Sequence, residues 1–439
     1  MGLFDFLTGK KEQSKEDGVE FGHFLECNKP YAFTKIWKEA TELFKDEKHI
    51  QSFERFLGYL ENPPHKNVTY TKEFEKIEFE IVHGSAIIKG TFDDKGLYAF
   101  TEIGRFNGVA TALFRDLLIK NYMMHYNCFC IDDKTVIIKH HSPLSECSPT
   151  KMYYAIKEMA MKADIHSQAL FDDFGMLEES FGRAPKEIPE TERDIKVKYL
   201  KKWINDTFSE LSSMTPDKDA NIMSHYLLSL SYRVDFLLSP RAKVWKLNDM
   251  AVAIYSDKVL AVPEKIRKMM SYLRDILDMS DEDMKASFFK TVDTFAIVNA
   301  STHNDLVQFF LKEFSSAKYY AERRLDRHTQ AVYEQALGYV LYFQGVFPPV
   351  RELLTLYYKI FYPEFFEEMG IKCNLYDPAL NKFSKWTIEG QINKIISRNR
   401  KTYPKLMFYF QNLRYENSNS FAYTFLNEIT FLNFWMKPQ

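Results

Sequence analysis

The chain has 439 residues, of which 46% are hydrophobic and 27% are charged, and its formal net charge is -2 at pH 7. This length suggests two or three domains of roughly 150 residues each, and this composition excludes a largely disordered chain. Because the chain has no basic excess to neutralise a phosphate backbone, general nucleic-acid binding is disfavoured.

Cysteine content and apolar runs bear on the compartment. The five cysteines are an odd number and lack the spacing of a disulfide framework, which favours a reducing compartment. No run of roughly 18 apolar residues occurs, so we expect no integral membrane segment. We therefore expect a cytoplasmic protein.

Residues 1–30 are expected to form a flexible polar tail. The start, MGLFDFLTGKKEQSKEDG, lacks the long apolar region and the cleavage site of a signal peptide. Phe6 stands where a myristoylation signal requires Ser or Thr. A short apolar tip precedes Lys10 and Lys11, which leaves weak contact with a membrane surface as an alternative to a frayed terminus.

Residues 31–175 predict an α+β domain. Two helix-like segments come first, and the period then changes to two at residues 77–81, where apolar residues alternate with glutamates. Further strands are expected at SAIIKGTF and LYAFTEIGR. These segments together predict a three-stranded antiparallel meander.

A helix is expected to follow in VATALFRDLLIKNYMM. Helical spacing predicts one apolar face made of Ala110, Leu113, Phe114, Leu117 and Leu118. The next stretch, HYNCFCIDDKTVIIKHH at residues 125–141, predicts a strand, a turn and a strand.

Ser148 and Pro149 have the character of an N-cap and a first helical residue, so we expect a last helix that runs to about Gly175. Its buried stripe is expected at Met152, Ala155, Ile156, Met159, Ala160 and Ala163. The order α(α)-βββ-α-ββ-α is typical of an antiparallel sheet that has its helices mainly on one side.

The rest of the chain predicts a linker and an all-α domain. Residues 176–191 are charged, contain Pro185 and Pro189 and show no period, so we expect a linker there. Residues 192–439 predict an all-α domain, with candidate helices at 192–213, 217–239, 262–279, 281–298, 303–325, 328–344 and 349–369 and two or three more in 385–435. The stretch AVAIYSDKVLAV fits a helix and turn better than a hairpin.

A C-terminal aromatic stripe has two interpretations. It consists of Phe421, Phe425, Ile429, Leu432 and Trp435 at helical spacing. We favour core packing over an aromatic-lined groove or an oligomer contact.

Residues 125–147 concentrate cysteines and histidines and so raise the question of a metal site. Residues two apart on a strand are separated by about 6.6–6.8 Å, whereas two cysteine sulfurs on zinc lie roughly 3.8 Å apart. The spacing of Cys128 and Cys130 therefore argues against a shared metal, and it argues equally against a disulfide between them.

Successive residues of a strand face opposite sides of the sheet, so the expected hairpin also separates these side chains. A turn near Asp133 and Lys134 would place Phe129 and Ile131 opposite Ile138 and Val136, as one apolar face toward the helices. The cysteines would share the other face with Ile137, Lys139 and His141, whereas His140 would point with the apolar face. We expect no bound metal and no cofactor.

Catalytic signatures do not occur. The chain contains no G-x-S-x-G, no H-E-x-x-H and no phosphate-binding G-x-x-x-x-G-K-[ST]. Mixed runs of acidic and basic residues, such as MSDEDMK and AERRLDRH, are typical of solvated helix faces. We therefore expect no catalytic residues.

A family resemblance lies in residues 117–164. Its features are Leu117-Leu118 with Asn121, a strand at 129–131, an acidic turn at 132–133, an apolar strand at 135–138, Leu144-Ser145 and Ala163-Asp164. This pattern resembles the type III secretion chaperone-like fold, including the YbjN-type proteins. The resemblance implies a non-enzymatic fold that dimerises and holds extended segments of a client. The chain departs from the pattern because it is close to neutral and continues into a large helical region.

Together these features predict a non-catalytic, chaperone-like protein of bacterial type. It would bind a protein or peptide partner, or a second copy of itself, through apolar surface. The expected contact face comprises Cys128, Cys130, Ile137, Lys139 and His141. An enzyme with a site at the domain interface is the alternative, and a zinc-binding module at residues 125–147 is the weakest one.

Overall fold

The computed structural model describes residues 21–22, 29, 32–62, 65–108, 110–175, 177–179, 187–296, 298 and 300–436. The chain divides into two compact units. One, the sheet unit, comprises residues 23–188 and 289–299, and the other, the helical unit, comprises residues 1–22, 189–288 and 300–439. Most of the expected tail at 1–30 lies outside the described residues.

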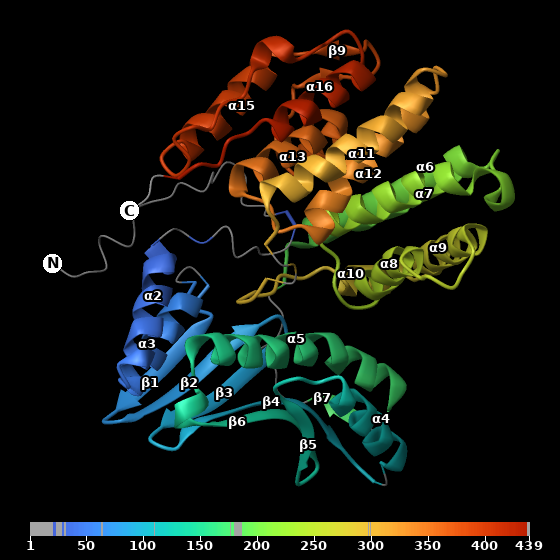
Figure 1. Cartoon of the computed structure of the whole chain (residues 1–439). Coiled ribbons are helices and arrows are strands. Elements are labelled where there is room, and N and C mark those ends of the chain that lie inside the picture. The colour runs from blue at the N-terminus through green and yellow to red at the C-terminus, as the bar shows by residue number, and fades with distance from the viewer. Residues whose placement is uncertain are drawn as a thin grey trace. The chain divides into compact units, whose positions relative to one another are not determined.

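The sheet unit is an α+β fold (Figure 1). Its elements are α2 (Ala32–Lys45), α3 (His49–Leu60), β1 (Val68–Glu73), β2 (Lys76–His83), β3 (Ala86–Asp93), β4 (Gly96–Phe106), α4 (Thr111–Tyr122), β5 (Cys128–Asp132), β6 (Thr135–Pro143), a 3-10 turn (Leu144–Glu146), α5 (Pro149–Asp173) and β7 (Leu177–Glu179). The strands pair antiparallel in the order β1-β2-β3-β4-β6-β5, and β7 pairs with the end of β4.

In the sheet unit, two strands were not predicted from the sequence. The meander has four strands rather than three, because β1 precedes the predicted ones and pairs with β2 from Val68 to Glu73. Only Val68 of β1 is buried, so this edge strand has no alternating pattern to reveal it. The expected linker at 176–191 contains β7, whose Leu177 pairs with Phe106.

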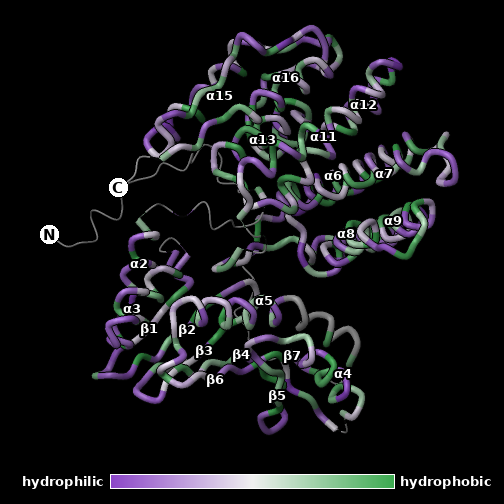
Figure 2. Tube along the Cα trace, in the orientation of Figure 1, coloured by the Kyte–Doolittle hydropathy of each residue, from purple (hydrophilic) through white to green (hydrophobic). Residues whose placement is uncertain are grey.

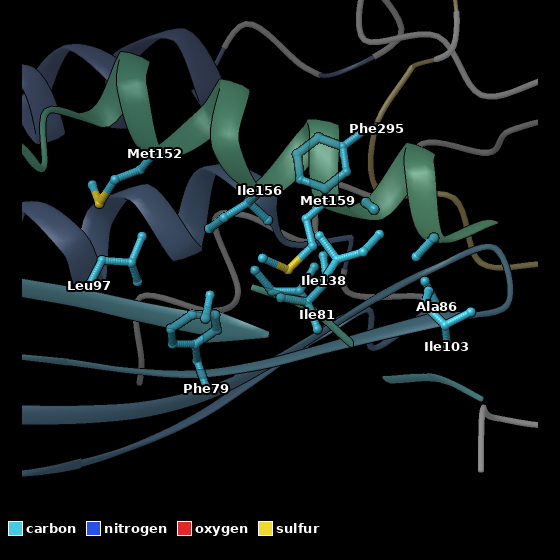
Figure 3. Close-up of a cluster of buried hydrophobic side chains, with 14 of the residues drawn as sticks. Phe79, Ile81, Ala86, Leu97, Ile103, Ile138, Met152, Ile156, Met159 and Phe295 are labelled. Atoms are coloured by element: carbon cyan, nitrogen blue, oxygen red, sulfur yellow. The ribbon is translucent and has the colours of Figure 1, made fainter. Parts of the chain in front are cut away.

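The helices α2, α3 and α5 share one hydrophobic core with the inner face of the sheet. The strands carry both hydrophobic and hydrophilic residues (Figure 2), and in β2 the buried residues at 77, 79 and 81 alternate with glutamates. Figure 3 shows Met152, Ile156 and Met159 of α5 directed at the strands, and all three are almost completely buried. On α3 and β3, the rings of Phe53 and Phe92 stack with their centroids 4.3 Å apart.

The predicted start of α5 is confirmed. Pro149 is its first residue, and the Ser148 side chain accepts a hydrogen bond from the Lys151 N–H at 3.3 Å, which satisfies one of the free donors of the first turn. The predicted buried stripe is confirmed as well, since each of its six members is at most 2% exposed.

The segment 289–299 belongs to the sheet unit although helical-unit residues flank it. The predicted helix at 281–298 is therefore wrong beyond Ala286, where α10 (Asp281–Ala286) ends. Val292 instead forms a bridge with Gly84 in the β2–β3 turn, and the Gly84 N–H donates to the Val292 carbonyl at 3.0 Å. The expected all-α domain at 192–439 is interrupted by this excursion.

Thr294 fixes that segment to the sheet. Its hydroxyl donates to the Val82 carbonyl at 2.5 Å and accepts from the Asn67 amide at 2.8 Å. The Thr294 N–H donates to Nδ1 of His83 at 3.1 Å. The adjacent Phe295 (Figure 3) is fully buried. Its ring packs edge-on against Tyr153 of α5, at 5.6 Å between ring centroids.

The helical unit consists almost entirely of helices. They are α6 (Glu190–Leu211), α7 (Pro216–Arg233) with a π-helical turn (Val234–Leu238), α8 (Ala242–Tyr255), α9 (Val262–Leu277), α10, α11 (His303–Ala321), α12 (Asp326–Phe343), α13 (Pro348–Phe361), α14 (Pro363–Glu368), α15 (Lys385–Asn399), a 3-10 turn (Phe410–Asn412) and α16 (Ser418–Thr430). The short strands β8 (Tyr376–Asp377) and β9 (Lys382–Phe383) pair with each other.

The C-terminal aromatic stripe is mostly core. Phe421, Phe425, Ile429 and Leu432 are buried, as favoured, but Trp435 is 41% exposed beneath the Lys405 ammonium. Within the described part of the chain, no helix is both long enough and apolar enough to cross a membrane.

Candidate functional site

The β5–β6 hairpin has the predicted register. Phe129 lies opposite Ile138, Ile131 opposite Val136, and the turn falls at 133–134. The Asn121 side chain, at the end of α4, contacts the backbone of Phe129 twice. Its Oδ1 accepts from the Phe129 N–H at 2.6 Å, and its Nδ2 donates to the Phe129 carbonyl at 2.9 Å.

Glu158 of α5 organises the loop that leads into this hairpin. Its carboxylate accepts hydrogen bonds from the backbone N–H groups of His125, Tyr126 and Asn127 at 2.8–3.1 Å. Burial alone would raise the pKa of the Glu158 carboxyl, but these hydrogen bonds outweigh it and hold the pKa below its usual range. The Asn127 amide also donates to Glu158, at 2.7 Å.

The remaining histidines and cysteines of residues 125–147 point to different places. His140 is buried, and its Nδ1 donates to the Tyr126 carbonyl at 2.8 Å. Cys147 is buried on the core side, and its thiol donates to the Pro143 carbonyl at 3.3 Å. Nowhere among the described residues do three or more His, Cys, Asp or Glu side chains converge as metal ligands would.

Cys128 and Cys130 differ from the expectation. Their sulfur atoms lie 3.3 Å apart, so the inference that strand spacing keeps them separated is wrong. The strand period fixes the Cα positions, but rotation about χ1 turns each thiol toward the other. Burial and the neighbouring Cys130 thiol raise the pKa of Cys128 to about 11.

The face of the sheet opposite α2, α3 and α5, here called the helix-free face, carries the expected contact residues. The register places Ile137 opposite Cys130 and Lys139 opposite Cys128, and His141 pairs with Tyr98 on β4. Lys139 and His141 are exposed and both cysteines are half-buried, but Ile137 is only 5% exposed. Ile137 is therefore not accessible as an apolar contact, and the accessible part of its row is polar.

A larger exposed apolar surface lies on α4, where the sequence predicted a buried face. Ala110, Leu113 and Leu117 are buried as predicted, but Phe114 and Leu118 are 37% and 69% exposed. They continue into further exposed side chains on the outward side of the helix. We define the α4 surface as Phe114, Leu118, Ile119, Tyr122 and Met123.

The composition of α4 explains this arrangement. In TALFRDLLIKNY, apolar residues occupy both the inward and the outward arcs, so helical spacing alone cannot say which arc is buried. Tyr122 and Ile119 are 91% and 69% exposed, which leaves most of their area in water. The exposed Arg115 lies within the outward arc, and Lys120 pairs with Asp116 beside it.

The helical unit contains a polar pocket of about 500 Å³. It is lined by Asn221, Ser224, His225, Tyr255, Ser315, Ser316, Tyr319 and Tyr320. Burial lowers the pKa of His225, while a hydrogen bond with Gln335 opposes that effect. The Ser224 hydroxyl donates to the Asn221 carbonyl at 2.6 Å. None of these lining residues is a carboxylate.

A buried ion pair also lies in the helical unit. Arg233 of α7 donates to Glu334 of α12, and Glu334 also accepts from the Tyr362 hydroxyl at 2.6 Å. The guanidinium lies over the rings of Trp203 and Tyr362, at 4.9 and 4.6 Å from their centroids. The group connects α6, α7, α12 and the start of α14, which is a structural role.

Comparison with known proteins finds no family model and no curated protein that matches this chain.

Proposed function

We propose that this protein is a non-catalytic protein-binding module that holds an apolar segment of a partner protein against the α4 surface. The observation that carries the proposal is the exposure of five large apolar side chains, four of them on α4 and the fifth, Met123, directly after it. Burying a Leu or Ile side chain is worth about 1.5–3 kcal/mol, so leaving several in water is costly unless something covers them. Contiguous apolar surface of this kind marks interaction sites.

The charges around the α4 surface indicate the chemistry of the partner. Asp116 and Lys120 are paired with each other at 2.5 Å, whereas Arg115 projects into solvent among the apolar side chains. An amphipathic partner segment with a carboxylate among apolar residues would match that charge and the apolar area together. Binding of a partner to the helix-free face with Cys128, Lys139 and His141 stays a prediction, and that face exposes less apolar area.

We further propose that the sheet unit is a type III secretion chaperone-like domain. Two helices, a meander, α4, a hairpin and a long last helix follow one another in the order that the resemblance implies. Asn121 of the Leu-Leu-x-x-Asn pattern makes a specific contact with the hairpin, which gives that pattern a physical reason. The added strand β1 is a departure from the expected order.

Self-association is the first property to measure. Sedimentation velocity of the full chain and of its Leu118→Glu variant tests whether the α4 surface binds a second copy of this chain or a different protein. We expect both proteins to sediment as monomers over a wide concentration range. A dimer that dissociates on Leu118→Glu would show instead that the α4 surface binds a second copy of this chain, and the proposed heterologous partner would be dropped.

A partner is then tested by reconstitution. Proteins captured on the full chain are purified and titrated against the original chain, Leu118→Glu and a control, Leu380→Glu, which changes an equally exposed leucine in the helical unit. We expect at least a tenfold loss of affinity for Leu118→Glu and none for the control. Equal affinities for all three chains would contradict the proposal.

A further inference from the structure

The two half-buried cysteines of β5 form the most compact pair of reactive groups on the sheet. Cys128 and Cys130 share one face of the strand, and their sulfur atoms are 3.3 Å apart. The intervening Phe129 is buried and its backbone N–H and carbonyl both bind the Asn121 side chain, so the backbone between the two thiols is fixed. The pair is therefore positioned by the fold and not by a loop.

The distance between the two sulfur atoms restricts which atoms the pair can bind. A disulfide needs sulfur atoms about 2.05 Å apart, which would require the clamped strand to pucker. At metal–sulfur distances of about 2.3 Å, sulfurs 3.3 Å apart subtend an angle of about 90° at the bound atom, narrower than the tetrahedral angle of zinc. Trivalent arsenic, which is pyramidal and has bond angles near a right angle, fits this spacing with no movement of the backbone.

The surroundings favour a two-thiol site. Both sulfurs are partly accessible on the helix-free face, and within the described residues no third His, Cys, Asp or Glu joins them to complete a harder metal site. Thiols are soft ligands and select soft, thiol-seeking ions. Lys139 lies opposite Cys128 in the ladder.

We propose that Cys128 and Cys130 form a bidentate dithiol site for a soft thiophilic ion of low coordination number, of which trivalent arsenic is the chemical class that fits best. With an organic arsenoxide, R–As=O, two S–H bonds and the As=O bond break and two As–S bonds form. The oxygen leaves with both protons as water, and nothing is oxidised or reduced. The site is independent of the α4 surface.

The test uses phenylarsine oxide with the full chain, reduced with a phosphine and kept in native buffer. Intact mass spectrometry should show one phenylarsine adduct per chain. Cys128→Ser and Cys130→Ser should each lose it, with at least a tenfold fall in adduct yield at limiting reagent. Cys147→Ser, which changes a buried thiol outside the pair, should keep the adduct in full.

A measurement on the unmodified sequence guards against misfolded variants. Bound phenylarsine should protect Cys128 and Cys130 together from alkylation by N-ethylmaleimide, as read by peptide mapping, and leave the other cysteines unchanged. The proposal is overturned if no adduct forms on the native chain, if it forms only after unfolding in guanidinium, or if Cys128→Ser retains it.

Discussion

The side-chain amide of Asn121 binds both backbone groups of Phe129, accepting from its N–H at 2.6 Å and donating to its carbonyl at 2.9 Å. These are the two bonds that a neighbouring strand would make. Because β5 is an edge strand of the sheet, the amide occupies backbone groups that would otherwise be open to pairing with another chain. The hairpin and the end of α4 are thereby fixed to each other.

Replacing Asn121 should loosen the hairpin. Asn121→Ala removes both of these hydrogen bonds to the Phe129 backbone, at a cost of about 1–3 kcal/mol in unfolding free energy. Urea denaturation should show this loss, and hydrogen exchange of the β5 amides should accelerate. Asn107→Ala, in an exposed position with one long contact to Glu178, is the control and should change little. A change no larger than that of the control would contradict the role of Asn121.

The carboxylate of Glu158 should make the stability of the sheet unit depend on pH. Because its folded pKa is lowered, its contribution is complete above the unfolded value of 4.5 and is lost as the pH falls through the folded pKa. Glu158→Gln should therefore be less stable than the original chain at pH 7, and this difference should shrink as the pH falls below 4.5. Denaturation at several pH values measures it, with the exposed Glu75→Gln as a control. A difference that grows in acid would refute the assignment.

The segment 289–299 should detach from the sheet when Thr294 loses its hydroxyl. Thr294→Val removes the bonds to Val82 and Asn67 and leaves buried polar groups unpaired, which costs about 1–3 kcal/mol. Limited trypsin digestion should cut faster after Lys290. Thr291→Val is the matched control, since that hydroxyl donates to the nearby Asp293 at 3.2 Å. Equal digestion rates for both variants would show that Thr294 does not hold the segment.

Arg233 and Glu334 should be strongly coupled. Glu334→Leu leaves a buried guanidinium without its counter-charge and should cost about 3–5 kcal/mol. Arg233→Met combined with Glu334→Leu should cost much less than the two single changes added together, because no buried charge remains. Urea denaturation of all four proteins completes the cycle. Additive losses would mean that the pair is not coupled.

The exposed pair Arg327 and Glu210 serves as a comparison for that cycle. Its side chains are 77% and 36% exposed, so solvent screens their attraction. Neutralising either one should change the unfolding free energy by less than about 1 kcal/mol.

The elements that the sequence predicted correctly have strong local signals. The stripe of α5, its Ser148 cap and the register of the β5–β6 hairpin follow from period and turn chemistry. The expected burial of the hairpin's apolar face holds only in part, because Ile131 is 41% exposed. Those signals are local, so no knowledge of distant contacts is needed to find them.

The features that were not predicted from the sequence depend on contacts between residues far apart in the chain or on side-chain rotation. The partners of Thr294 lie more than two hundred positions away, so its segment has no local signal for leaving the helical unit. The helix α4 is apolar on two arcs, and only the packed sheet decides that Leu117 is buried while Leu118 is exposed. The approach of Cys128 to Cys130 depends on χ1, which strand spacing does not determine.

The most direct test of partner binding by the α4 surface is photocrosslinking. A benzophenone amino acid replaces Tyr122 on the α4 surface or, as a control, the similarly exposed Trp386 in the helical unit. Position 122 should yield a defined adduct that disappears when Leu118→Glu is added, with the same partner binding the purified chain at least tenfold more tightly than the variant. Equal adducts from both positions, or an adduct from position 122 that survives Leu118→Glu, would contradict binding through the α4 surface.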